Sequence, residues 1–237
     1  YVLESIRKYV PVISPYKRVF EDRIAFIVDG TRTGGLSITD VLLKDDDVRE
    51  TILERKPYYS FNALHPNTIE VVGRDIMDGP DVLFKKGQML FCLRDVNIIG
   101  VIDLMEEEVV WWMGDEGLID GAHDPSITKD GNILLFDNGV SRGYSRIVEI
   151  DPATKKGVWT YEADPPESFF SNVMGGVQEL GNGNYLVTES TKGRAFEVTR
   201  DKRVVWEFIN GFDDGWRKVV YRMKRYGEGE LNNSWNG

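Results

Sequence analysis

The chain has 237 residues, of which 41% are hydrophobic and 29% are charged, and this is the composition of an ordinary globular protein. Its 29 Lys and Arg against 39 Asp and Glu give a net charge of −10. The negative charge excludes a general nucleic-acid binder and disfavours an anionic membrane surface, because both of these partners select basic proteins. Apolar runs stay far below the ~20 residues that cross a bilayer, so no membrane segment is expected.

Several common chemistries are excluded by inspection. The sequence contains no phosphate loop, no dinucleotide-binding turn, no nucleophile elbow and no zinc-helix motif. A single cysteine, Cys92, excludes an internal disulfide and a Cys-based zinc site. The only histidines are His65 and His123, so we expect neither a His-rich metal centre nor a cofactor.

Internal repetition is the strongest feature of the chain. Trp112, Trp159 and Trp206 each end a similar apolar segment, and they are spaced 47 and 47 residues apart. Upstream of each tryptophan, a tight-turn pair precedes an apolar run of strand-forming residues. The turn pairs are Lys86-Gly87, Asp130-Gly131 and Asn182-Gly183. Because Gly readily takes the positive φ that two-residue turns require, each pair predicts a hairpin.

A period of roughly 40–50 residues with four strands per unit is typical of a β-propeller blade. We therefore predict an all-β fold, a β-propeller of four-stranded antiparallel blades, with about four blades in this chain. The tryptophans are interpreted as packing between neighbouring blades. The pattern leaves three arrangements open: a ring that closes at four blades, a larger ring completed by further chain, or a ring completed by a partner.

The domain organisation follows from the repeat. We expect a degenerate first blade over residues 1–59, with a short helix at 2–9, and three clear blades over 60–226. Residues 218–226 alternate like a closing strand, and 227–237 are expected to form a frayed tail. The strands expected in the degenerate blade are Arg23 to Asp29, Leu36 to Leu43 and Val48 to Glu54.

Two histidines and an arginine are the candidate site residues. His65 and His123 each begin the first strand of a blade, and we predict that they occupy equivalent positions and converge on the central channel. Arg94 follows a second strand and is predicted to point the same way. The alternative interpretation is ordinary: two hydrogen-bonded strand ends and a surface ion pair.

At this point the sequence resembles a known family. The stretch from His65 to Tyr226 is similar, in wording and in order, to the arylsulfotransferases of the PAPS-independent kind. The similar phrases are Leu64-His65-Pro66-Asn67-Thr68-Ile69, Leu93-Arg94-Asp95-Val96-Asn97, Val101-Ile102-Asp103, His123-Asp124, Gly131 to Gly139, Gly181-Asn182-Gly183-Asn184, Gly193 to Thr199, Val204 to Glu207 and Val220 to Tyr226. They cover about two thirds of the chain.

The resemblance implies a six-bladed ring, of which this chain holds a part, and a function. Enzymes of this kind move a sulfuryl group from a phenolic sulfate ester to another phenol through a transiently sulfated histidine, without a cofactor. By motif, His123 is similar to the nucleophile. His65 and Asn67 resemble the pair that meets the sulfate and the phenolic oxygen, and Arg94 resembles the arginine that clamps the sulfate oxygens. The implied partners are a small aromatic sulfate ester and a phenol, and the implied location is periplasmic or extracellular.

The sequence also departs from that family. No histidine precedes His65, although the family has one in an earlier blade, and the ring is short by about two blades. The alternative function is therefore a non-catalytic or degenerate propeller that serves as a binding or assembly module, with a second copy or a partner chain completing the ring. A third and weaker alternative is a sugar- or quinone-binding propeller. Its aromatic pocket would be lined by Phe91, Tyr144, Phe169 and Phe170, for which core packing is the simpler interpretation.

Overall fold

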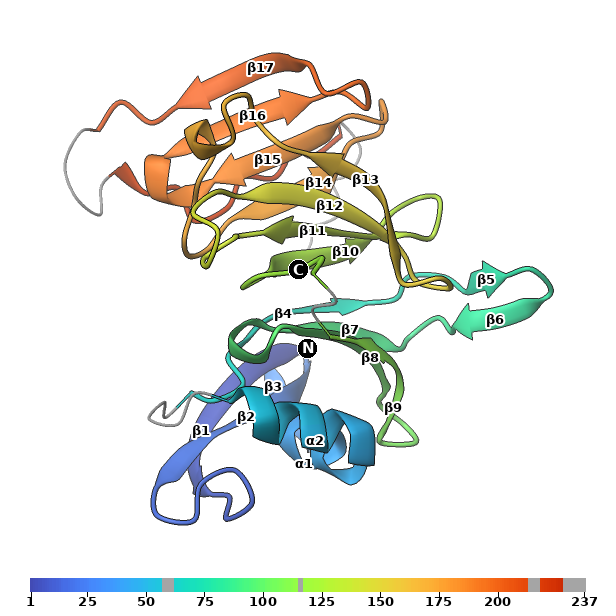
Figure 1. Cartoon of the computed structure of the whole chain (residues 1–237). Helices are drawn as coiled ribbons and strands as arrows, with labels where there is room; N and C mark the ends of the chain where they lie inside the picture. Colours follow the sequence, from blue (N-terminus) through green and yellow to red (C-terminus); the bar gives the residue numbers. More distant parts are fainter. Residues whose placement is uncertain (57–61, 115–116, 213–217, 228–237) are drawn as a thin grey trace.

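The computed structural model describes residues 1–56, 62–114, 117–212 and 218–227, and these form antiparallel sheets with two short helices (Figure 1). The N-terminal elements are β1 (Val2–Tyr9), β2 (Arg18–Val28), β3 (Thr31–Ser37), α1 (Ile38–Lys44) and α2 (Asp46–Arg55). Three four-stranded sheets follow, each with its strands hydrogen-bonded in chain order apart from one inserted hairpin. The predicted all-β fold of four-stranded antiparallel sheets is confirmed.

The first sheet contains β4 (Pro66–Val71), β7 (Met89–Leu93), β8 (Ile98–Asp103) and β9 (Glu108–Met113). The second contains β10 (His123–Ile127), β11 (Ile133–Asp137), β12 (Arg146–Asp151) and β13 (Lys156–Tyr161). The third contains β14 (Gly176–Glu179), β15 (Tyr185–Glu189), β16 (Arg194–Val198) and β17 (Val204–Ile209). Between β4 and β7, the hairpin of β5 (Ile76–Asp78) and β6 (Asp81–Phe84) projects from the stack (Figure 1).

The tight turns form where the sequence predicts them. Gly87, Gly131 and Gly183 adopt positive φ angles of 94°, 92° and 82°. In each turn the glycine N–H donates to a nearby carbonyl, that of Val72, Thr128 and Leu180 respectively. Because only glycine takes this conformation without strain, the three positions fix the start of β7, β11 and β15.

The sheets stack face to face, and each central strand is buried on both of its faces. In β11, Ile133 and Leu135 pack toward the first sheet, whereas Leu134 and Phe136 pack toward the third. The inner strand β10 contacts both β4 and β14. Burial from both sides explains the nearly continuous apolar strands. Because the three sheets share one strand order, the first residues of their inner strands lie at one end of the stack.

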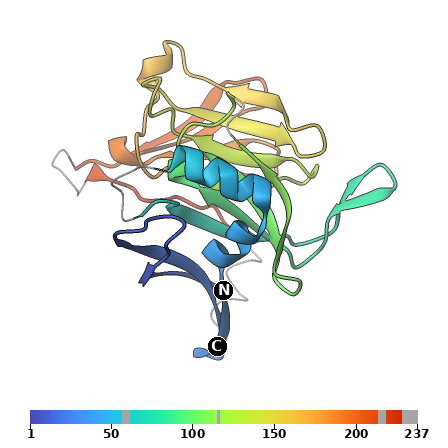
Figure 2. The same cartoon turned by 60° about the horizontal axis from the view of Figure 1, so that its bottom comes forward.

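The N-terminal region differs from the prediction. The helix expected at residues 2–9 is strand β1, which pairs with β2 along its whole length. The strands expected at 36–43 and 48–54 are largely helices α1 and α2, because Ser37 and Asp45 cap them by accepting the N–H of Asp40 and Val48. These helices pack on the first sheet through Ile38, Leu42 and Ile52 among others (Figure 2).

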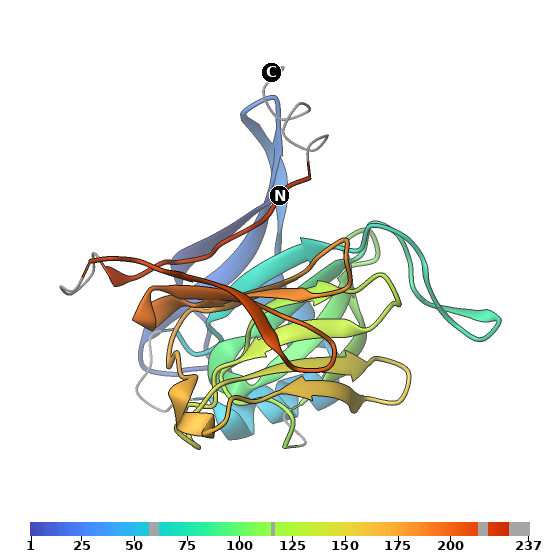
Figure 3. The same ribbon diagram turned by 90° about the horizontal axis from the view of Figure 1, so that it is seen from above.

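Two other predicted elements also turn out differently. Residues 218–226 form no ladder with a strand, although their backbone contacts the third sheet, as in the bond from Val220 N–H to the Ser190 carbonyl at 3.2 Å. They are held by side-chain contacts, such as Met223 N–H to Thr188 Oγ1 at 2.9 Å, and they cross the sheet in Figure 3. Most of the predicted tail, 228–237, and the boundary at 59/60 lie outside the described residues. No described helix is long and apolar enough to cross a membrane.

The tryptophan repeat joins neighbouring sheets. The indole N–H of Trp111 donates to the carbonyl of Pro152 at 2.9 Å, and that of Trp159 donates to Arg200 at 2.8 Å. Each acceptor lies 41 residues after its tryptophan. Trp111, and not Trp112 as the spacing suggested, is therefore the equivalent of Trp159. The same bulge occurs beside Trp111, Trp159 and Trp206, but the turn between β16 and β17 is one residue shorter than its two counterparts, which brought Trp112 into the even spacing.

Replacing Trp159 with phenylalanine should lower the free energy of unfolding by about 1–2 kcal/mol, because the ring is kept while the hydrogen bond to the Arg200 carbonyl is lost. Trp206 offers a matched control, since it is 40% exposed and no hydrogen bond of its indole is seen in the described part of the chain. Trp206→Phe should change stability by less than ~0.5 kcal/mol. Urea unfolding of both variants measures the difference, and equal losses would contradict this role of the indole N–H.

Candidate active site

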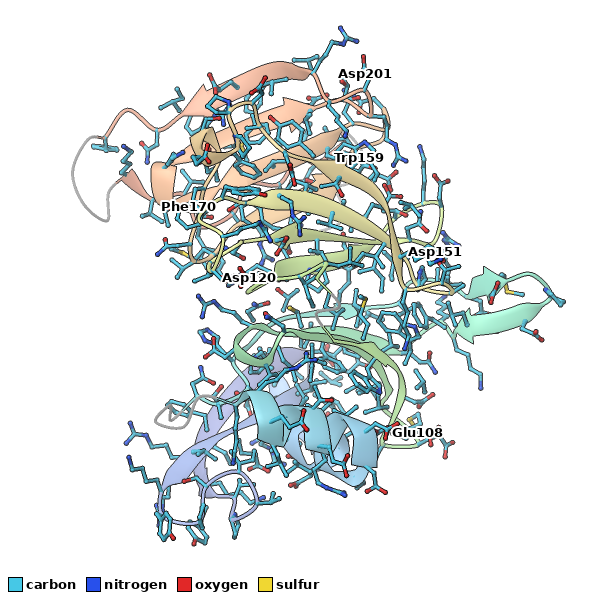
Figure 4. The ribbon with its side chains drawn as sticks, in the orientation of Figure 1. Glu108, Asp120, Asp151, Trp159, Phe170 and Asp201 are labelled. Carbon is cyan, nitrogen blue, oxygen red and sulfur yellow. The ribbon has the colours of Figure 1, made fainter. Side chains whose placement is uncertain are left out.

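His123 begins β10 at the end of the stack where Asp120 and Phe170 are labelled in Figure 4, opposite the turns that carry Asp151 and Asp201. Its side chain is buried, and the residue is 8% exposed. The ring atom Nδ1 lies 3.1 Å from the Gly121 carbonyl and 2.7 Å from Oδ1 of Asn138. Both of these neighbours are oxygen atoms, and they decide which of the two ring nitrogens carries the proton.

Asn138 determines the tautomer of His123. Its side chain is fully buried, and its Nδ2 donates to the carbonyls of Ser171 and Met174, both at 2.7 Å. Those two bonds orient the amide so that Oδ1, which can only accept, faces the imidazole. The Gly121 carbonyl can also only accept, so Nδ1 carries the proton. Nε2 therefore holds the lone pair, and it has no hydrogen-bond partner among the described residues.

The surroundings keep the His123 ring neutral. The pKa of His123 is lowered to about 4, chiefly by burial, and the nearby charges of Arg94 and His65 act in the same direction. The hydrogen bonds to Asn138 and Gly121 act in the opposite direction but are weaker. Near neutral pH the ring is consequently an unprotonated nucleophile or base.

This pKa has a consequence for stability. The folded-state value of about 4 lies below the ordinary 6.5, so between these values the unfolded state binds more protons. Protonation of His123 therefore favours the unfolded state, and the free energy of unfolding decreases as the pH falls from about 6.5 toward about 4. Between about pH 7 and about pH 5, His123→Gln should lose less stability than the parent in urea unfolding. Burial raises the pKa of Asp22 to about 6, so this residue stabilises the folded state as the pH falls. The parent and His123→Gln share this contribution, and it cancels when their losses of stability are compared. Equal losses would contradict the depressed pKa.

Arg94 lies beside the histidine on the turn that follows β7. A Cβ at Gly121 would lie 4.0 Å from Arg94 Nε, so the guanidinium packs against the same backbone that bonds His123. Its Nη1 pairs with Asp95 at 2.6 Å and its Nη2 donates to the Asn172 carbonyl at 3.3 Å. Nε is buried and has no hydrogen-bond partner among the described residues.

His65 joins the same cluster through Asp95. Its Nδ1 lies 3.4 Å from the second carboxylate oxygen of Asp95, and its side chain is 40% exposed. Burial raises the pKa of Asp95, but His65 and Arg94 more than offset this and lower it overall. His65 adopts φ of 51°, and its carbonyl accepts the N–H of Arg94 at 3.2 Å. The structure thus connects His65, Asp95 and Arg94 to the surroundings of His123.

Asn67 supports the backbone before His123. Its Nδ2 donates to the Ala122 carbonyl at 2.8 Å, and the Sγ of Cys92 donates to the same carbonyl at 3.2 Å. Its Oδ1 is buried without a partner among the described residues. The amide of Asn67 is therefore held by the protein through its donor, and its acceptor oxygen is buried.

The predicted equivalence of the two histidines is wrong. Glu70 pairs with Leu90 in the first sheet, and Ser126 pairs with Leu134 at the same register of the second. The residue three positions before Glu70 is Asn67, and the residue three positions before Ser126 is His123. The position equivalent to His123 is therefore Asn67, and His65 lies two residues before it. The bulges near the start of β4 and β10 hide this shift from a comparison of sequence alone.

Sequence reasoning assigned no role to Asn138 or Asp95, which orient His123 and His65. A positional signal exists, because Asn138 follows β11 just as Arg94 follows β7. The predicted aromatic pocket does not form as such: Phe91 and Phe169 are fully buried core residues, and Tyr144 stacks with Arg142. No cluster of His, Cys, Asp or Glu suited to a metal ion occurs within the described ranges.

Stacked four-stranded sheets with a polar site at the ends of their inner strands define a propeller-type protein. A family model described as arylsulfotransferase (ASST) matches residues 41–211, and the chain belongs to this family. The predicted family membership is confirmed. No curated protein matches the chain.

Solved structures give more distant likenesses. A virginiamycin B lyase from Staphylococcus aureus is 18% identical with a TM-score of 0.44, covering 65% of this chain and 43% of that one. A protein of unknown function from Bacteroides caccae is 14% identical with a TM-score of 0.37, covering 61% and 58%. Hydrazine synthase of Kuenenia stuttgartiensis is 13% identical with a TM-score of 0.37, covering 60% and 36%. The chain thus spans roughly a third to just under three fifths of these structures.

Proposed function

We propose that this chain transfers a sulfuryl group from a phenolic sulfate ester to a phenol acceptor through a covalent intermediate on His123. Membership of the arylsulfotransferase family supports the reaction type. The observation that carries the mechanism is the fixed tautomer of His123, whose Nδ1–H is held by Asn138 and Gly121 and whose Nε2 keeps its lone pair.

In the first half-reaction, the Nε2 lone pair attacks the sulfur of the aryl sulfate. The N–S bond forms as the bond between sulfur and the phenolic oxygen breaks, and the departing phenolate takes that electron pair. A neutral imidazole is a competent nucleophile near neutral pH and also a good leaving group. The hydrogen bond from Nδ1–H to Asn138 stabilises the positive charge that the ring acquires on sulfation.

Arg94 and His65 supply the electrostatic part of the reaction. The guanidinium of Arg94 is a planar array of donors suited to the sulfuryl oxygens, and its orientation is fixed by Asp95. His65, partly exposed and paired with Asp95, is positioned to give a proton to the departing phenolate. In a chain of net charge −10, these groups provide the local positive field that an anionic ester needs.

The second half-reaction reverses the first with a new phenol. Its oxygen attacks the sulfur, the N–S bond breaks, and its electron pair returns to Nε2. The proton of the acceptor phenol passes to His65, which restores the starting state of the site. Incubating the protein with an aryl sulfate and an acceptor phenol tests both half-reactions. The free donor phenol and the sulfated acceptor should form in equal amounts. Absence of the sulfated acceptor would contradict the proposal.

Removing the partner of His123 should slow the reaction without removing the nucleophile. Asn138→Ala is expected to lower kcat by about tenfold to a hundredfold, the range for groups that orient a reacting histidine. Nitrogen NMR of His123 should show a mixture of tautomers in place of the single Nδ1–H form. Asn184→Ala, which alters a turn at the opposite end of the third sheet, serves as the control and should react like the parent. An unchanged tautomer in Asn138→Ala would contradict the assigned role.

The alternative is a binding or assembly module, and one observation favours it. Strand β17 is exposed along its whole length and carries Trp206, Phe208 and Ile209 on the surface. Such an apolar outer strand fits a partner interface. The two functions are distinguished by turnover, because a module binds its partner without releasing the donor phenol.

A further inference from the structure

Two valines are exposed on loops beside the candidate site. Val140 follows β11 and is 45% exposed, and Val173 precedes β14 and is 36% exposed. A single apolar side chain on a surface is ordinary and indicates no function. These two have a neighbour in common, however, because each lies next to a residue that Arg94 packs against or bonds.

Val140 packs on the glycine that lies beside Arg94. A Cβ placed on Gly121 would meet Val140 Cγ2 at 3.1 Å and Arg94 Nε at 4.0 Å. Gly121 is itself buried, and its carbonyl lies 3.1 Å from His123 Nδ1. The valine, the guanidinium and the imidazole are therefore grouped around one glycine.

Val173 lies next to a second contact of the guanidinium. Arg94 Nη2 donates to the carbonyl of Asn172, the preceding residue, at 3.3 Å. On the other side of the valine, the carbonyl of Met174 accepts Asn138 Nδ2 at 2.7 Å. Asn138 is also the side chain that orients the candidate nucleophile, so one amide fixes both the histidine ring and the backbone at Val173.

The loop that carries Val140 is fixed by Asp120, which is labelled at this end of the stack in Figure 4. Gly139 N–H donates to the Asp120 carbonyl at 2.8 Å, and Ser141 N–H donates to Asp120 Oδ2 at 2.7 Å. A Cβ on Gly139 would lie 1.8 Å from the carbonyl oxygen of Tyr144, so only glycine fits there. A ligand that contacts Val140 therefore meets an ordered loop, and ordering it costs no affinity.

A sulfate ester bound at Arg94 needs an apolar surface close by. Its aromatic ring is joined to the sulfur through a single oxygen atom, so the ring stays near the guanidinium that holds the sulfuryl oxygens. Aliphatic side chains give such a ring apolar contact and offer it no competing hydrogen bonds. In both half-reactions the phenolic oxygen lies on the side of the sulfur opposite Nε2, so the donor and acceptor rings occupy the same place in turn.

We propose that Val140 and Val173, here called the apolar rim, bind the aromatic ring of both the donor ester and the acceptor phenol. The inference rests on the proposed function, and it names the part of the site that selects the aromatic group. A larger ring system covers more apolar surface, so the site should favour 2-naphthol, which has two fused rings, over phenol itself.

Threonine variants test the apolar rim, because threonine has nearly the shape of valine but replaces a methyl group with a hydroxyl. Equilibrium binding of 2-naphthol and of phenol to the full chain is measured by titration, without any sulfate donor. Replacing both Val140 and Val173 with threonine should weaken 2-naphthol binding by about threefold to tenfold and reduce its preference over phenol. Val158→Thr is the matched control, since Val158 is 50% exposed on the outer strand β13, and it should bind like the parent.

Methyl NMR shows where the ring binds. The ring current of bound 2-naphthol should shift the methyl resonances of Val140 and Val173 and leave those of Val158 in place. This readout depends on the position of the ligand, and a merely structural role of the two valines would not produce it.

The outcomes separate this inference from the proposed function. A parent that binds 2-naphthol at the two valines but transfers no sulfate would contradict the proposed function and support the apolar rim. A parent that transfers sulfate to 2-naphthol while the double threonine variant binds it equally well would overturn the apolar rim alone. Failure of the parent to bind 2-naphthol, or equal methyl shifts at Val158, would also overturn it.

Discussion

His123→Ala is expected to lower sulfuryl transfer by roughly 10³-fold or more, because the covalent route loses its nucleophile. The side chain is buried, and its Nε2 has no competing hydrogen-bond partner among the described residues. Removing the imidazole also leaves a cavity beside Asn138 and Gly121. Added imidazole should occupy that space and restore part of the activity, measured as release of the donor phenol.

The control for this variant separates chemistry from folding. His123→Gln keeps a polar side chain of similar size and should have the far-ultraviolet circular dichroism of the parent while remaining inactive. His65→Ala should retain more activity than His123→Ala, because it removes a proton donor and not the attacking atom. If both His123 variants fold and transfer sulfate at the parental rate, His123 is not the nucleophile.

Arg94→Ala is expected to lower kcat by about 10²–10³-fold, the cost of removing one preorganised donor from a developing oxyanion. Its ion pair with Asp95 and its bond to the Asn172 carbonyl hold the guanidinium beside Gly121, whose carbonyl contacts His123. Arg94→Lys should recover only part of the loss, because an ammonium keeps the charge but not the planar pair of donors. Steady-state kinetics with an aryl sulfate measures both.

Arg74→Ala is the matched control for Arg94→Ala. It removes the same charge from an arginine that bonds the backbone of Thr128 and Lys129 in another part of the second sheet. Its kinetics should match those of the parent. A similar loss in both variants would show that net charge, and not the position of Arg94, controls the rate.

The stacked sheets were predictable because their signals are local. Gly87, Gly131 and Gly183 mark their turns through backbone conformation alone, and the tryptophans recur at a nearly constant spacing. The error between Trp111 and Trp112 arises because the turn between β16 and β17 is one residue shorter than its two counterparts, and nothing in the spacing of the tryptophans reveals this. Bulges at different positions near the start of β4 and β10 made His65 and His123 look equivalent.

The elements that were missed depend on context. The residues of α1 and α2 include Val41, Leu42 and Ile52, which favour a strand or a helix according to what they pack against, and the capping side chains of Ser37 and Asp45 decide it. Asn138 was missed because its role needs two carbonyls from the loop before β14, more than 30 residues away. His123, Arg94 and His65 could be proposed from sequence, but the bonds that orient them could not.

The most direct measurement of the central claim is trapping of the intermediate. The full chain is incubated with an aryl sulfate without any acceptor phenol, quenched at alkaline pH and examined by peptide mass spectrometry. The peptide that contains His123 should gain the mass of one SO₃ group, and the gain should disappear when an acceptor phenol is added before the quench. A modification on His65 or on another residue, or release of the donor phenol with His123 unmodified throughout, would contradict the account.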